Sequence, residues 1–180
     1  MQEKYRAAVR AGLTSGVVLA ACELAFGLVL LFLRSDVQDF FNGPGDDTSS
    51  LVPVATVWLA FLFLVIAAYF ACGMFAAKWL MPLSLKSGQI AAMGAVAGAV
   101  AEVVRTVMSI FIDFVLNLTA PLVHGSSADV FNTALENAGL RLVCGMPTYI
   151  ILAAAVAGIS AYAFSTIFFQ PEPLALPEHQ

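Results

Sequence analysis

Four long apolar stretches, separated by polar connections, constrain the fold of this 180-residue chain more than any other feature of its sequence. Each stretch is long enough to cross a hydrocarbon core of about 30 Å as a helix. The stretches lie at about residues 11–33, 52–77, 89–116 and 142–169. The chain is 61% hydrophobic and 11% charged, whereas soluble domains contain about 25% charged residues. We therefore predict an all-α integral membrane protein with four transmembrane helices in a single domain, residues 1–170.

The connections between these stretches differ in composition from the stretches themselves. Residues 35–51 contain four aspartates and a Gly-Pro-Gly turn, which is typical of a solvated loop. Within the longer connection, residues 127–138 carry apolar positions at helical spacing, which predicts a short helix at the membrane interface. The tail, residues 171–180, contains three prolines and is predicted to be disordered.

Lysine and arginine are distributed unevenly over the ends of the predicted spans. Five lie before the first span or between the second and third, namely Lys4, Arg6, Arg10, Lys78 and Lys86. Only Arg34 and Arg141 flank the opposite ends. Because cytoplasmic connections hold the excess of positive residues, we predict that both termini are cytoplasmic and that the chain lies in the cell membrane. Trp58 and Trp79 are 21 residues apart, about 31 Å along a helix, which places one at each membrane interface.

A weak internal repeat is visible at an offset of 82 residues. The offset pairs four positions of the first and third spans: Lys4 with Lys86, Gly12 with Gly94, Gly16 with Gly98, and Glu23 with Arg105. A true repeat predicts two helical hairpins of the same orientation, related by an axis along the membrane normal. The alternative is that small residues recur in any packed membrane helix.

The third span carries small residues in its first half and polar residues in its second half on one helical face. The small residues are Gly88, Ala91, Ala95 and Gly98, and the polar ones are Glu102, Arg105, Thr106, Ser109 and Asp113. The first span has a similar face with Gly12, Gly16, Ala20, Glu23 and Gly27. Small residues allow close backbone approach, so we expect these two faces to pack together, with Gly94 and Gly98 forming a GxxxG pair. Val100 points away from Glu102 and is expected to tolerate substitution.

The ionisable residues of these faces predict a polar cluster inside the membrane. Glu102 and Arg105 are one turn apart and can form an ion pair within their helix. Glu23 has no such neighbour on its own span, but it lies at the same depth as Arg105 if the two spans run parallel. We therefore predict a Glu23–Arg105 contact, because an unpaired arginine at mid-bilayer is costly.

Two functions are compatible with such a cluster. In the first, the cluster is a structural ion network, and the chain is a non-enzymatic subunit that assembles with itself or with other membrane proteins. In the second, Glu23, Glu102 and Arg105 line a proton, ion or substrate path of a small transporter or channel-like protein. Neither histidine, His124 or His179, lies in a predicted span, and the motifs HExxH, GxSxG and GxxxxGK[ST] are absent.

The same features set expectations about activity and ligands. We expect no enzymatic activity, no metal site and no cofactor. The net charge of −4 and the lack of a large basic cluster argue against nucleic acid as a partner. The expected surroundings are the lipid bilayer and other membrane-spanning chains.

Overall fold

The computed structural model describes residues 2–32, 51–83, 85–119 and 139–168, and these are almost entirely helical. The long helices are α1 (Gln2–Phe32), α3 (Leu51–Leu80), α4 (Ser87–Thr119) and α7 (Met146–Phe168). Two short segments adjoin them, the 3₁₀ turn η1 (Met81–Leu83) and the π-helical segment η2 (Arg141–Gly145). Each of the four long helices is apolar and long enough to cross a membrane, which confirms the prediction of four helices with the length and composition of membrane spans.

The helix ends follow from local sequence. Helix α1 begins at Gln2 rather than near residue 11, because residues 2–10 contain no glycine or proline and continue the helix beyond the apolar stretch. Pro82 lies in the 3₁₀ turn that follows α3. Pro147 lacks the N–H that would bond to the carbonyl of Val143, which accounts for the wider π-helical turn at this point. The predicted interfacial helix 127–138 and the tail 171–180 lie outside the described residues.

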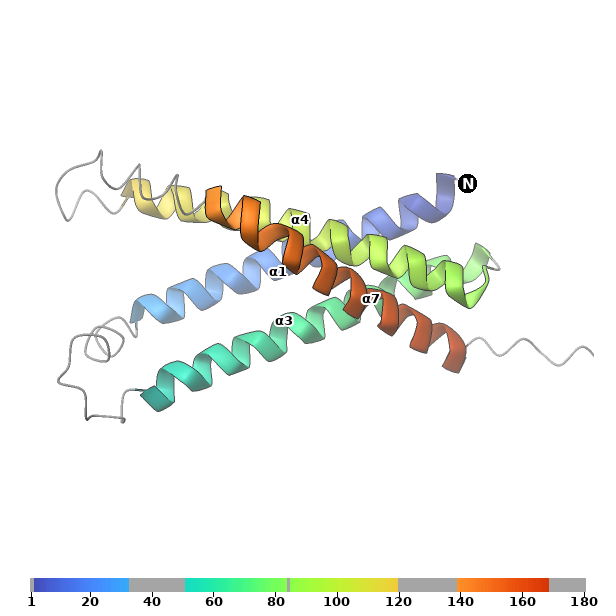
Figure 1. Ribbon diagram of the computed structural model, residues 1–180, viewed down its shortest axis with the longest axis horizontal. Coiled ribbons are helices and arrows are strands. Elements are labelled where there is room, and N and C mark those ends of the chain that lie inside the picture. The colour runs from blue at the N-terminus through green and yellow to red at the C-terminus, as the bar shows by residue number, and fades with distance from the viewer. Residues whose placement is uncertain (1, 33–50, 84, 120–138, 169–180) are drawn as a thin grey trace, which may run out of the picture.

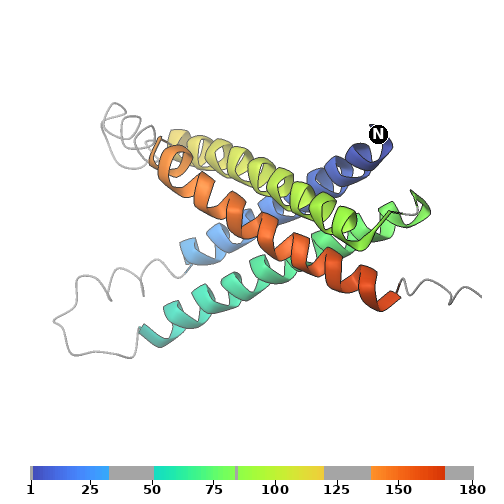
Figure 2. The same cartoon turned by 45° about the vertical axis from the view of Figure 1, so that its right-hand side comes forward.

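The four helices form two antiparallel hairpins that cross each other (Figures 1 and 2). Helices α1 and α4 run in one direction, and α3 and α7 run in the other (Figure 1). The start of α1, the connection from α3 to α4 and the end of α7 therefore lie at the same end of the bundle. Helices α3 and α4 each pack against all three other long helices, and the contacts of α4 with α7 and α1 are the most extensive in the fold.

Helices α4 and α7 approach closely through glycine and alanine. A Cβ atom added to Gly98 would overlap the carbonyl oxygen of Ala153 and lie 2.7 Å from the Cβ of Ala157. A Cβ atom added to Gly94 would lie 2.8 Å from the carbonyl oxygen of Ala157. Because the atoms in the way include backbone oxygens, these two glycines permit a helix separation that alanine would prevent.

The glycines of α1 lie against a different face of α4. A Cβ atom on Gly12 would lie 2.6 Å from the carbonyl oxygen of Ala97, and one on Gly16 would lie 2.8 Å from that of Ala101. The expected pairing of the two glycine faces with each other is therefore wrong. Gly12 and Gly16 do contact α4, whereas Gly94 and Gly98 face α7. Helix α4 carries small residues on two of its faces, so one helix can approach it closely on each face.

Three further expectations differ from the structure. Val100 was expected to face away from neighbouring helices, but it is at the α1 contact, where its Cβ would lie 2.7 Å from a Cβ atom on Gly12. Gly27 and Gly88, expected at helix contacts, have no atom of the described residues within 4 Å of an added Cβ. Both therefore face open space among the described residues.

The glycines paired by the 82-residue offset do not occupy equivalent places. Gly94 faces α7, its partner within the second hairpin, whereas Gly12 faces across to the other hairpin. The two glycines of each pair therefore have different neighbours, so their positions do not support a duplicated hairpin.

Helix α3 joins the bundle through a small and polar face that sequence patterning did not single out. Gly73 approaches Ala157 and Ser160 so closely that an added Cβ atom would overlap both. The Ser160 hydroxyl donates a hydrogen bond to the carbonyl oxygen of Phe70 at 2.9 Å, which links α7 to α3. Nearer the other end of α3, the ring of Phe61 stacks on Phe26 of α1 with centroids 4.1 Å apart.

Candidate functional site

The polar residues of α4 lie on one face because their spacing of three or four residues matches the helical repeat. These residues are Glu102, Arg105, Thr106 and Ser109. Glu102, Thr106 and Ser109 are buried, and the Arg105 side chain is 13% exposed. This face of α4 points toward the middle of the bundle, where it contacts α1 and α3. We call the group formed by these four residues with Glu23 and Tyr69 the central network.

Arg105 and Glu102 form a two-pronged ion pair within α4. The Nε and Nη2 atoms of Arg105 each donate to a different carboxylate oxygen of Glu102, both at 2.8 Å. Bidentate pairs of this kind are stronger and more directional than single contacts. The pair predicted from the i, i+3 spacing is therefore present, and it orients the guanidinium toward α1.

The third branch of the guanidinium joins α4 to α1. Arg105 Nη1 donates to Glu23 Oε2 at 3.0 Å, which confirms the predicted Glu23–Arg105 contact. The Ser109 hydroxyl donates to the other carboxylate oxygen of Glu23 at 2.9 Å. Two parallel helices are thus joined at equal depth by one cation and one hydroxyl.

Helix α3 contributes Tyr69, whose hydroxyl donates to Oε2 of Glu102. The hydroxyl of Thr106 donates to Oε1 of the same carboxylate at 3.0 Å. The sequence pattern did not single out Tyr69, so its part in the network was not predicted. The available signal was the face that Tyr69 shares with Cys72, Gly73 and Ala76, which are all buried.

Helix α7 reaches the network through an aromatic ring. The Cζ atom of Arg105 lies 5.7 Å from the ring centroid of Tyr149, a distance typical of a cation–π contact. Arg105 therefore has contacts with residues of α1, α4 and α7, and its partner Glu102 is bonded to α3. All four long helices meet at this one ion pair.

The charges of the network do not cancel if both carboxylates are ionised, since Glu23 and Glu102 face a single guanidinium. Among the described residues, every buried side-chain nitrogen and oxygen has a hydrogen-bond partner. Glu102 is fully enclosed, whereas the side chain of Glu23 is 23% exposed. Glu23 is thus the carboxylate of the pair that a proton or cation can approach from outside.

The network offers a poor site for a metal ion. Its two carboxylates are both bonded to Arg105, whose positive charge opposes the binding of a cation between them. No group of three or more His, Cys, Asp or Glu residues that could hold a metal occurs in the described part of the chain. Asp113, assigned to the same face by its spacing, lies on α4, but its side chain is not among those that the structure describes.

No protein-family model, no curated protein and no solved structure matches this chain.

Proposed function

We propose that this chain is a non-enzymatic structural subunit of the cell membrane, one that assembles with itself or with other membrane-spanning chains. The observation that carries the proposal is that the buried polar atoms of the central network all have hydrogen-bond partners within this chain. Glu102 accepts hydrogen bonds from Tyr69, Arg105 and Thr106 and is fully enclosed. A group so completely bonded within its own chain serves to fix helix positions, because substrate would have to displace those bonds.

The surface that remains for assembly lies on the outward faces of α3 and α7. Phe63 of α3 is 72% exposed, and Ile151 and Ile159 of α7 are 71% and 68% exposed. These faces carry no charged residue over the middle of either helix, so they suit lipid or the apolar face of a partner helix.

The first test is purification in a mild non-ionic detergent, followed by measurement of mass and identification of co-eluting chains. The proposal predicts a stable homo-oligomer or a stoichiometric complex with other membrane subunits. A monomer that co-elutes with no other chain in any mild detergent would contradict it.

We propose, as a second candidate, a small proton- or cation-coupled transporter. The observation that favours it is the excess of one carboxylate in the network together with the exposure of Glu23. In this case Glu23 takes up and releases the transported proton or cation, while Glu102 and Arg105 remain paired. Proton or cation flux into proteoliposomes, present for the native chain and lost in Glu23→Gln, would establish this function, and absence of flux in both would exclude it.

We propose that both termini are cytoplasmic, on the basis of the excess of positive residues at the end of the bundle that holds the start of α1 and the connection from α3 to α4. Single cysteines at Ser49 and at Ser84, in a background without the native cysteines, test the orientation with an impermeant thiol reagent. Labelling of intact cells is expected at position 49 only. Labelling at position 84 only would invert the orientation.

A further inference from the structure

A groove of about 1130 Å³ lies at the end of the bundle, between the first turns of α1 and the last turn of α3 with η1. It shares no residue with the central network. Its charged lining consists of Arg6, Arg10 and Lys78, with Glu3 as the one carboxylate. The groove therefore carries a net positive charge at the surface of a chain whose net charge is −4.

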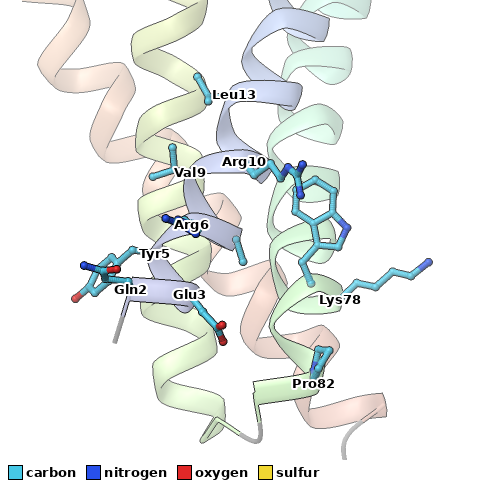
Figure 3. A pocket seen from close by; sticks show the side chains of 11 residues that line it. Gln2, Glu3, Tyr5, Arg6, Val9, Arg10, Leu13, Lys78 and Pro82 are labelled. Atoms are coloured by element: carbon cyan, nitrogen blue, oxygen red, sulfur yellow. The ribbon is translucent and has the colours of Figure 1, made fainter.

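The three cations of the groove are exposed, and none of them forms an ion pair with another described residue. Among the described residues, the ion pairs involve only Arg105 with Glu23 and Glu102. Arg6 and Arg10 are one helical turn apart on α1, and Lys78 lies across the groove on α3 (Figure 3). Two of these cations lie on α1 and one lies on α3, so both helices contribute positive charge to the lining, and Glu3 offsets only part of it.

The groove changes from polar to apolar along its length. Val9 and Leu13 lie toward one end, whereas Glu3 and Pro82 lie toward the other (Figure 3). Leu13 is deeper along the α1 span than Arg6, so the apolar end points into the bilayer and the polar end points out of it. A ligand that fills this groove has a charged part outside the hydrocarbon and an apolar part within it.

Trp79 also lines the groove, on the helix that has Trp58 near its other end. Tryptophan is enriched where the headgroup region meets the hydrocarbon. The groove therefore lies at headgroup depth, where cations between transmembrane helices commonly contact lipid phosphates.

We propose that this groove binds the phosphodiester headgroup of an anionic phospholipid. Arg6, Arg10 and Lys78 neutralise the phosphate, and an acyl chain of the same lipid lies along Val9 and Leu13. A lipid fits better than a free phosphate, because free phosphate would leave the apolar end of the groove without a partner. The site is independent of the function proposed for the central network.

The test is a lipid titration of the intact protein in a non-ionic detergent, read by native mass spectrometry. The ligands are phosphatidylglycerol, phosphatidylcholine and inorganic phosphate. The variant is Arg6→Gln combined with Lys78→Gln. Its matched control is Lys4→Gln combined with Lys86→Gln, which removes the same charge from the same end of the bundle outside the groove lining.

The native chain is expected to bind phosphatidylglycerol at least about tenfold more tightly than phosphatidylcholine or phosphate. Each cation near a lipid surface contributes roughly a fivefold gain in affinity, so the groove variant should bind phosphatidylglycerol about 25-fold more weakly. The control should change by less than about threefold. Arg10→Gln alone, expected to weaken binding about fivefold, provides a second variant in case the double variant does not fold.

Three results would overturn the proposal. Equal weakening by the groove variant and the control would mean that surface charge alone attracts the lipid. Equal affinity for phosphatidylcholine would mean that the cations do not select the headgroup. Displacement of phosphatidylglycerol by inorganic phosphate at equal concentration would identify a site for a free anion.

Discussion

Helix α4 meets α7 and α1 by two different means. Its contact with α7 rests on Gly94 and Gly98, which bring backbones together, and it adds the cation–π contact of Arg105 with the ring of Tyr149. Its contact with α1 begins in the same way at Gly12 and Gly16 but ends in ion pairs and hydrogen bonds around Arg105. The first contact is non-directional, whereas the second fixes one register of α1 against α4.

The difference has a physical cause in the membrane. Lipid is as apolar as a leucine side chain, so helix association depends on close packing and on polar contacts rather than on the hydrophobic effect. Close packing of glycine and alanine brings backbones into van der Waals contact over several turns. A charge network adds specificity, because a helix placed one turn away would leave a buried charge without its partner.

The largest expected effect comes from removing the cation at the centre of the network. Arg105→Gln leaves two carboxylates without an opposite charge and should lower the free energy of unfolding by about 3 to 5 kcal/mol. Unfolding by sodium dodecyl sulfate in mixed micelles measures this change. Lys86→Gln, which removes a positive charge at an exposed position outside the groove, is the control and should change stability by less than about 0.5 kcal/mol. Equal effects at the two positions would mean that Arg105 does not hold the helices together.

The next effect concerns the small-residue contact of α4 with α7. Gly98→Ala places a methyl group against the carbonyl oxygen of Ala153 and should cost about 1 to 3 kcal/mol, because the two backbones must separate. Gly27→Ala is the matched control, since its new methyl group meets open space and should stabilise α1 by about 0.5 to 1 kcal/mol. The same unfolding assay reads both, and destabilisation by the two alanines alike would contradict the packing described for Gly98.

The smallest effect is expected from the α3 branch of the network. Tyr69→Phe removes one hydrogen bond to Glu102, which keeps its bonds to Arg105 and Thr106. Hydrogen bonds between membrane helices contribute about 0.6 kcal/mol on average and at most about 1.7 kcal/mol. A loss above about 3 kcal/mol in the unfolding assay would show that Tyr69, rather than Arg105, is the centre of the network.

The helices and the depth of the charges could be predicted from sequence, because both depend on composition and helical spacing. The Glu23–Arg105 contact followed from two positions at equal depth on parallel spans, and the structure confirms it. Which face of α4 meets which helix could not be predicted, since a helix with small residues on two flanks has no sequence signal for the choice. Gly98 and Val100 illustrate the point, because Gly98 faces α7 and Val100 faces α1.

Tyr69 and Gly73 were missed for a related reason. In a helix as apolar as α3, aromatic and small residues occur on every side, so neither residue type marks the buried face by itself. The buried face of α3 can be identified only from residues that recur at three- and four-residue intervals. Which residues it contacts is known only when the positions of α1, α4 and α7 are known.

The measurement that tests the central claim most directly is a double-mutant cycle on the free energy of unfolding with Glu23→Gln and Arg105→Gln. If the ion pair between α1 and α4 stabilises the fold, Glu23→Gln destabilises the native chain. The same substitution should be neutral or stabilising in the Arg105→Gln background, because it then removes an unpaired buried carboxylate. The account predicts a coupling of about 1 to 3 kcal/mol, and a coupling below about 0.5 kcal/mol would contradict it.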